Sequence, residues 1–120
     1  MESIRSAATA GDRLAPFCPA FHHAVEIIGR RWSGVIIRSM LAGKTRFGEI
    51  LDTVPGLSDR LLSERLKELE HEGIVVRKVI PQTPVRVEYH LTQKGLDLAG
   101  VVRAVAGWAE AWTPRGKAPA

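Results

Sequence analysis

Two amphipathic segments and two β-rich segments follow one another between Arg46 and Leu91, and their order constrains the fold more than any other feature. The first amphipathic segment ends at Pro55-Gly56, and the second runs from Ser58 to His71 with apolar residues at helical spacing. Residues 74–80 and 85–91 then alternate as strands do. This order predicts two helices joined by a short turn and followed by an antiparallel hairpin, the layout of a winged helix-turn-helix.

Helical spacing also occurs on both sides of this stretch. We expect a helix from Pro19 to Gly29, a second, nearly all-apolar helix capped by Ser33 and stopped by Gly43, and a third capped by Thr45. A last helix is expected to begin at Thr92. The sequence thus predicts an α+β, mainly helical fold with a two-stranded wing and a helix on each flank.

The length of 120 residues and the 45% hydrophobic content favour one domain, which we place at residues 16–112. Residues 1–15 and 113–120 lack periodicity and are expected to be a flexible arm and a flexible tail. One cysteine excludes an intrachain disulfide framework, and no apolar run reaches the length of a signal peptide or a membrane span. We therefore expect a soluble protein of the cytoplasm without a membrane partner.

The segment from Ser58 to His71 combines a leucine face with a polar stripe. Helical spacing places Leu61, Leu62, Leu66 and Leu69 on one side and the short polar and charged residues on the other. A helix in a DNA major groove needs such a stripe, and the net charge of +4 favours a polyanionic partner. The alternative is a solvated helix face, but the short turn before the helix and the hairpin after it favour DNA. The candidate base-reading and phosphate-binding residues of this helix are Ser58, Arg60, Ser63, Glu64 and Lys67.

Arginine and lysine elsewhere divide into candidate DNA contacts and structural residues. Arg65 falls on the leucine side, so we expect it to pack and to pair with a carboxylate. Arg86, beside two prolines, is expected at the hairpin tip, where it would contact the DNA backbone or the minor groove. The phosphate contacts expected near the start of the third helix, aided by its terminal amides, come from Lys44 and Arg46.

No enzyme motif is present: the sequence has neither a glycine-rich phosphate loop nor a nucleophile with partners for a triad. His22 and His23 point to different faces of one helix, so we expect no metal site and no cofactor. Two alternatives stay open beside DNA binding: a small-molecule pocket lined by the three tryptophans, and a winged helix that binds another protein.

The last expected helix carries an apolar stripe that is broader than one small domain needs. Its members include Leu98, Val101, Val102, Val105, Trp108, Ala109 and Trp112. This breadth favours a partner surface.

Several short motifs, in the right order from Cys18 to Trp112, resemble the HxlR-type winged helix-turn-helix transcriptional regulators of bacteria, within the MarR-like superfamily. They are Cys18-Pro19, Gly29-Arg30-Arg31-Trp32, Arg46-Phe47 with Glu49-Ile50, Pro55-Gly56-Leu57-Ser58, Leu66-Lys67-Glu68-Leu69-Glu70 with Gly73, and Val85-Arg86-Val87-Glu88-Tyr89 with Leu91-Thr92. Arg30-Arg31 departs from the glycine and lysine that the family more often has there.

The resemblance implies a homodimer joined through the first and last helices and bound to a roughly palindromic DNA operator. The interface residues expected on this basis are Phe21, Val101, Val105, Trp108 and Trp112. In several relatives a cysteine matching Cys18 senses oxidants or electrophiles, which makes a redox-sensing role one hypothesis and a small-molecule effector in an aromatic pocket at the dimer interface its alternative. Cys18 precedes the helix at Pro19, where a terminus can activate a thiol, but it could equally be a small, partly buried hydrophobe.

Overall fold

The computed structural model describes residues 14–114, which fall into two compact units, one up to Arg30 and one from Arg31 onward. Most of the expected N-terminal arm and C-terminal tail lies outside the described residues. Between residues 14 and 114 every helix is too short or too polar to cross a bilayer.

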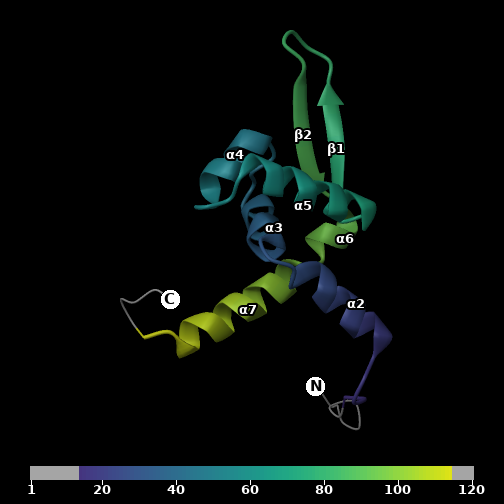
Figure 1. Cartoon of the computed structure of the whole chain (residues 1–120), viewed down its shortest axis with the longest axis vertical. Helices are drawn as coiled ribbons and strands as arrows, with labels where there is room; N and C mark the ends of the chain where they lie inside the picture. Colours follow the sequence, from purple (N-terminus) through teal and green to yellow (C-terminus); the bar gives the residue numbers. More distant parts are fainter. Residues whose placement is uncertain (1–13, 115–120) are drawn as a thin grey trace. The chain divides into compact units, whose positions relative to one another are not determined.

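The first unit contains one described helix, α2, which spans Pro19–Ile28 (Figure 1). Cys18 is its N-cap, Pro19 occupies the first turn, and Gly29 is the C-cap, so the expected helix is confirmed. No residue of α2 is buried within the chain, and Phe21 is 68% exposed.

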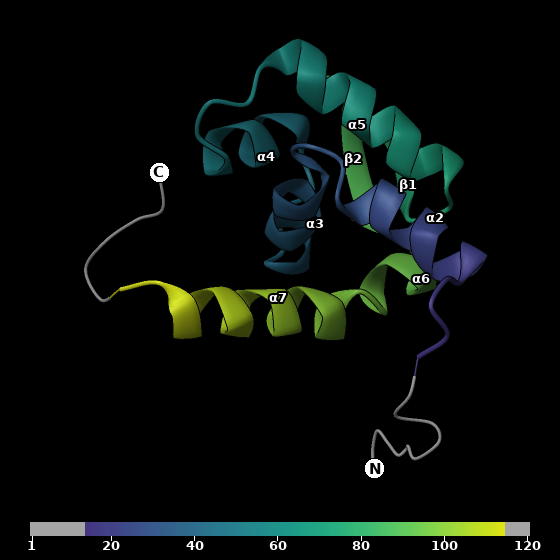
Figure 2. The same cartoon turned by 60° about the horizontal axis from the view of Figure 1, so that its bottom comes forward.

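The second unit is built on three helices: α3 spans Ser33–Leu41, α4 spans Phe47–Thr53 and α5 spans Asp59–His71. Figure 2 shows α3 lying between α4 and α7, the last helix. The apolar core of this unit comes from all three helices, from the turn between α4 and α5 and from the start of the hairpin. Its buried residues are Ile36, Ile37, Met40, Ile50, Val54, Leu57, Leu62, Leu66, Leu69, Ile74 and Val75. The helix-turn-helix expected from the Pro-Gly turn is therefore present as α4 and α5.

Two helix starts differ from the expected caps. The N-cap of α3 is Trp32 at φ 78°, and Ser33 is the first helical residue, buried and without a capping bond. The N-cap of α4 is Arg46 rather than Thr45. The carboxylate of Glu49 accepts hydrogen bonds from the N–H groups of both Thr45 and Arg46 at 3.1 Å, so a side chain from inside the helix satisfies this terminus.

The wing consists of β1, Val75–Ile80, and β2, Arg86–Leu91, paired antiparallel with Val75 opposite Leu91 and Ile80 opposite Arg86. Figure 1 shows this hairpin extending beyond α4 and α5. The N–H of Tyr89 donates to the carbonyl oxygen of Thr45 at 2.6 Å, which ties the hairpin to the chain just before α4. The expected α+β fold with a two-stranded wing is confirmed.

The last expected helix is two helices, α6 at Gln93–Leu96 and α7 at Ala99–Trp112. Thr92 caps α6, because its hydroxyl accepts a hydrogen bond from the N–H of Gly95 at 3.2 Å. Gly95 is buried, and a Cβ there would overlap the carbonyl oxygen of Ile74. This close packing holds α6 against the base of the wing, and the chain changes direction before α7.

Candidate nucleic-acid interface

The second helix of the pair, α5, is anchored through its leucine face. Leu62, Leu66 and Leu69 are at most 1% exposed, and Arg65 joins them at 7%. Ser58 caps the helix, because its Oγ accepts a hydrogen bond from the N–H of Leu61 at 3.1 Å. The buried face is thus confirmed for Leu62, Leu66 and Leu69, whereas Leu61 is half-buried. Arg60 and Lys67 are exposed on the outside of this packed helix.

The outer stripe contains an ion pair between two of the candidate base-reading residues. The side chain of Arg60 is 88% exposed, and its Nε lies 3.1 Å from Oε2 of Glu64 one turn later. Lys67 is exposed and Ser63 is half-buried. Two residues expected to read bases therefore contact each other in the free protein, and a base contact by either must replace or share that pair.

Arg65 is a packing residue, as its place among the leucines predicted. Its Nε donates to the carbonyl oxygen of Arg31 at 2.8 Å, and Nη1 lies 3.4 Å from Oε2 of Glu68. The expected pairing with a carboxylate is thus present at Glu68. The carbonyl of Arg31 could not have been inferred from helical spacing, because it lies in the chain before α3.

Lys44 and Arg46 are exposed near the start of α4, where phosphate contacts were expected. The amides of Thr45 and Arg46, which lie before and at the N-cap, donate to Glu49 and are therefore already engaged. These bonds, first that from Thr45 and then that from Arg46, lower the pKa of Glu49 below its ordinary value. These two amides are therefore not free to bind a phosphate, whereas the side chains of Lys44 and Arg46 are exposed.

Arg86 does not lie at the hairpin tip. It is the first residue of β2, opposite Ile80, and its side chain is only 37% exposed. Its Nε lies 3.1 Å from Oε2 of Glu88, whose Oε1 lies 2.8 Å from Nε2 of His90. The contact with His90, followed by the positive charge of Arg86, lowers the pKa of Glu88.

Glu49 and Glu88 were missed as parts of the site, although the sequence carried a signal for each. A glutamate three residues after a helix start often accepts from the amides there, which is the position that Glu49 has after Arg46. Glu88 alternates with Arg86 and His90 along one strand, so the period of two puts all three on one face. Trp32 gave no such signal, because positive φ is uncommon for a residue other than glycine.

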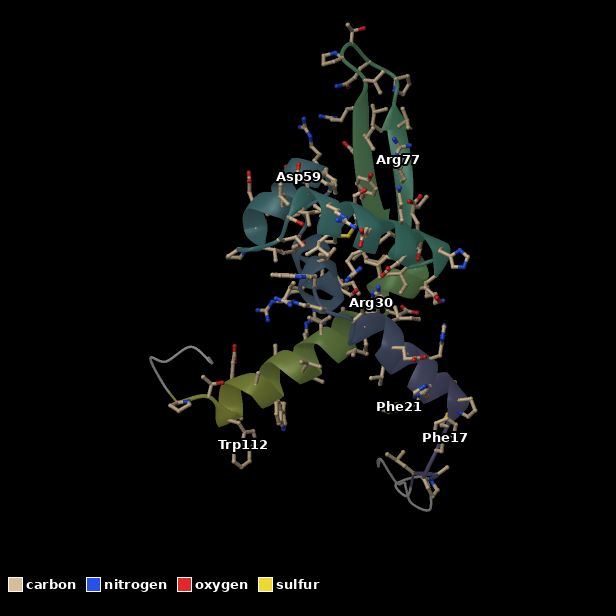
Figure 3. The ribbon with its side chains drawn as sticks, in the orientation of Figure 1. Phe17, Phe21, Arg30, Asp59, Arg77 and Trp112 are labelled. Atoms are coloured by element: carbon tan, nitrogen blue, oxygen red, sulfur yellow. The ribbon has the colours of Figure 1, made fainter. Side chains whose placement is uncertain are left out.

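Cys18 is an exposed free thiol at the start of α2. It borders an apolar hollow of about 490 Å³ whose lining also includes Leu14, Phe17, Phe21 and Val25. Figure 3 labels Phe17 and Phe21, which flank the start of this helix. The position combines an accessible sulfur with an apolar, aromatic surround.

The apolar stripe of α7 is open to solvent. Val101, Val105, Trp108 and Trp112 are 41%, 60%, 69% and 77% exposed, whereas Val102 and Ala106 are half-buried on the side of the rest of the unit. Trp112 projects from the end of the helix in Figure 3. The side chain of Trp32 instead borders the turn of the helix pair, because a Cβ at Gly56 would lie 3.5 Å from its ring.

A helix pair with a polar outer stripe on its second helix and a hairpin beside it defines the winged-helix class of DNA-binding transcriptional regulators. The chain belongs to the HxlR-like helix-turn-helix family, whose model matches residues 27–117. It is therefore a transcriptional regulator of the HxlR type, which agrees with the expectation that it is not an enzyme.

Relatives with known sequences or structures agree with this membership. The uncharacterized HTH-type transcriptional regulator YvaP of Bacillus subtilis is 53% identical over 95 residues, covering 79% of this chain and 88% of YvaP. The reduced form of the B. subtilis transcriptional regulator YodB superposes with a TM-score of 0.74 at 44% identity over 84% of this chain and 99% of YodB. The redox regulator HypR in its oxidized form also gives 0.74, at 37% identity over 81% of this chain and 99% of HypR.

Proposed function

We propose that this chain binds a roughly palindromic DNA operator as a homodimer, in the cytoplasm, with α5 in the major groove and the wing beside it. The observation that carries the proposal is the division of α5 into a buried leucine face and an exposed polar stripe. Arg60, Ser63 and Glu64 are the proposed base readers. The proposed backbone contacts are Lys44, Arg46, Ser58, Lys67 and Arg86.

The proposed dimer buries the exposed stripe of α7 and Phe21 of α2 against a second copy. Tryptophan and valine at 41% to 77% exposure form a larger apolar surface than a solvated helix usually carries. Aromatic residues are also enriched where proteins associate. A symmetric dimer would present two α5 helices to two half-sites, which is why the operator is expected to be palindromic.

Footprinting on the DNA upstream of the protein's own gene tests this function. Two protected half-sites with centres about one helical turn apart, or a multiple of it, are expected. A single protected half-site would contradict the dimer, and no protected site on any native promoter would favour a protein-binding role for the winged helix.

A second function, regulation of DNA binding by oxidants or electrophiles through Cys18, is favoured by one local observation. The thiol is exposed beside an apolar, aromatic hollow in which a planar electrophile would be desolvated. The similar regulator YodB has been solved in diamide-treated and quinone-bound forms, and HypR in an oxidized form. These treated, quinone-bound and oxidized forms are those of the relatives. We propose that this chain responds to oxidants or electrophiles in a similar way.

The test is to measure operator binding by wild type and Cys18→Ser before and after exposure to diamide or a quinone. Release of wild type but not of Cys18→Ser, reversed by a thiol reductant after diamide, is expected. Equal release of both proteins would exclude Cys18 as the sensor, and release of neither would contradict an oxidant response.

A further inference from the structure

A cleft of about 270 Å³ lies between the start of α4 and the wing. Arg46 lines it from the side of α4, and Gln82, Pro84 and Arg86 line it from the hairpin. Two arginines from elements that are distant in the sequence therefore face one cavity.

A main-chain contact fixes the spacing between these two arginines. The hydrogen bond from the N–H of Tyr89 to the carbonyl oxygen of Thr45 joins β2 to the residue directly before Arg46. Arg86 lies on the same strand as Tyr89. The two walls of the cleft thus belong to one hydrogen-bonded framework.

The carboxylate of Glu88 contacts the guanidinium of Arg86 at Nε, the nitrogen nearest the side-chain stem. The Nε atom of Arg86 is itself buried, and its 3.1 Å contact with Glu88 is an ion pair outside the angular range of a hydrogen bond. The carboxylate is only 18% exposed and also contacts His90. Because a guanidinium has donors on three nitrogens, an arginine engaged at Nε keeps its Nη groups for a second acceptor.

The charges around the cleft sum to a positive value. Lys78 lies opposite Glu88 in the strand register, and Arg46 is close enough for its charge to act on the same carboxylate. Arg46 and Lys44 also act on a second carboxylate, that of Glu49. Together with Arg86, four cations and two anions therefore lie around this part of the protein. A negatively charged group entering the cleft would be attracted despite Glu88.

We propose that this cleft binds one phosphate of the DNA backbone, gripped by Arg46 and Arg86 together, and that Glu88 is the positioning residue for Arg86. The inference rests on the proposed function, since the phosphate is that of the operator. Guanidinium forks match phosphate oxygens in geometry, and two of them from opposite walls would bind one phosphate from two sides. The alternative arrangement is that each arginine contacts a different phosphate.

The salt dependence of operator binding separates the two arrangements. The slope of log affinity against log salt concentration changes by about 0.9 for each phosphate that the protein ceases to neutralise. If the phosphate is shared, the double variant of Arg46→Ala and Arg86→Ala should flatten the slope by about 0.9, and neither single variant should flatten it by more than that. An unchanged slope in the double variant would mean that the cleft binds no phosphate. A double variant that flattens it by about 1.8 would mean two separate phosphates and would overturn the shared site.

Arg77→Ala is the matched control for these variants. Arg77 is an exposed cation of β1 that pairs with Tyr89 in the register, so it lies on the other face of the wing from Arg86. Adding Arg77→Ala to the Arg46→Ala, Arg86→Ala and double variants should not alter how the effects of the Arg46 and Arg86 substitutions on operator binding combine. Thermal unfolding of each variant checks that the fold is retained.

Glu88→Gln tests the positioning role through the sign of its effect. Removing a carboxylate near DNA should strengthen binding if only overall charge matters. If Glu88 positions Arg86, Glu88→Gln should instead weaken operator binding about threefold or more, and this loss should vanish in the Arg86→Ala background. Stronger binding by Glu88→Gln, or an equal loss in both backgrounds, would overturn the positioning role.

Failure of the proposed function would give a different result from failure of this inference. Wild type that binds none of the promoter fragments would overturn both. Wild type that binds an operator with additive losses for Arg46→Ala and Arg86→Ala would overturn the shared phosphate alone.

Discussion

The Nε atom of Arg65 donates a hydrogen bond to the carbonyl oxygen of Arg31 at 2.8 Å, across the start of α3. Arg31 is followed by Trp32, whose ring borders the turn before α5. Helix α5 is thus fixed to the chain before α3 by a buried arginine as well as by leucines. Arg65 and Arg60, both on α5, consequently have different roles.

Arg65→Ala should lower the free energy of unfolding by about 2 kcal/mol, because it removes a buried side chain from the leucine face and leaves the partly buried carbonyl of Arg31 without its charged donor. Arg60→Ala, the same change at an exposed site of the same helix, should change stability by less than about 0.5 kcal/mol. Urea unfolding monitored by tryptophan fluorescence measures both. Equal losses for the two variants would show that the contact between Arg65 and Arg31 does not anchor α5.

Substitutions on the outer stripe should separate the choice of operator from general affinity for DNA. Ser63→Arg adds a long cation where the helix is proposed to approach the bases, so it should change which operator variants are preferred. Lys67→Ala should weaken binding to operator and unrelated DNA alike and flatten the salt slope by about 0.9. Anisotropy titrations on a set of operator variants measure both effects. A change of preferred operator in Lys67→Ala, together with a uniform change of affinity in Ser63→Arg, would contradict this assignment of roles.

Acid should destabilise the fold partly through Glu49 and Glu88. Both carboxyl groups have a pKa lowered by their native contacts, so the unfolded chain takes up protons first as the pH falls below the ordinary glutamate value of 4.5. Their stabilising contribution is complete above that value and is lost as the pH falls through the lower pKa values of the folded protein.

Urea unfolding at neutral pH and at about pH 3 measures this loss. Glu49→Gln should show a smaller loss than wild type, because glutamine does not titrate. Glu70→Gln, which removes an exposed carboxylate of α5, serves as the control. An identical pH dependence of stability in Glu49→Gln and wild type would contradict a stabilising contribution from the hydrogen bonds that Glu49 accepts at the start of α4.

The apolar stripe of α7 should be required for dimerisation. Trp108→Ser should shift sedimentation from dimer toward monomer without unfolding the chain, because Trp108 is already 69% exposed in the monomer. Arg103→Ser, at an exposed position on a different side of the same helix, should leave the dimer intact. If Trp108→Ser remained fully dimeric, the interface would have to lie elsewhere.

Periodicity predicted the elements of this fold well because each carries enough residues to show its period. Thirteen residues of α5 define which face of the helix is buried. Six residues in each strand were enough to predict the hairpin, although β1 is buried only at Val75 and β2 is half-buried along its whole length. Arg65 could be recognised as a packing residue for the same reason. The break between α6 and α7 was missed, because apolar residues continue across it and the close packing of Gly95 against Ile74, which holds α6 at the base of the wing, is a tertiary contact.

The contacts at the proposed DNA surface were harder to predict than the faces. Charged side chains have several partners within reach, and the sequence does not decide whether Arg60 extends into solvent or pairs with Glu64. Arg86 was expected at the tip with its cation free for DNA, and it lies in the ladder pair next to the turn, but its side chain is only 37% exposed and pairs with Glu88. Such choices depend on register and on neighbouring elements, which local spacing does not contain.

Operator binding by a variant with Ala at Arg60, Ser63, Glu64 and Lys67 tests the recognition-helix assignment most directly. Equilibrium titrations would compare this variant and wild type on operator DNA and on unrelated DNA of the same length. We expect the variant to keep its fold and to lose at least about tenfold of the preference for the operator, because its base contacts are gone. Unchanged operator affinity and preference in this variant would contradict the assignment of α5 as the helix that reads DNA.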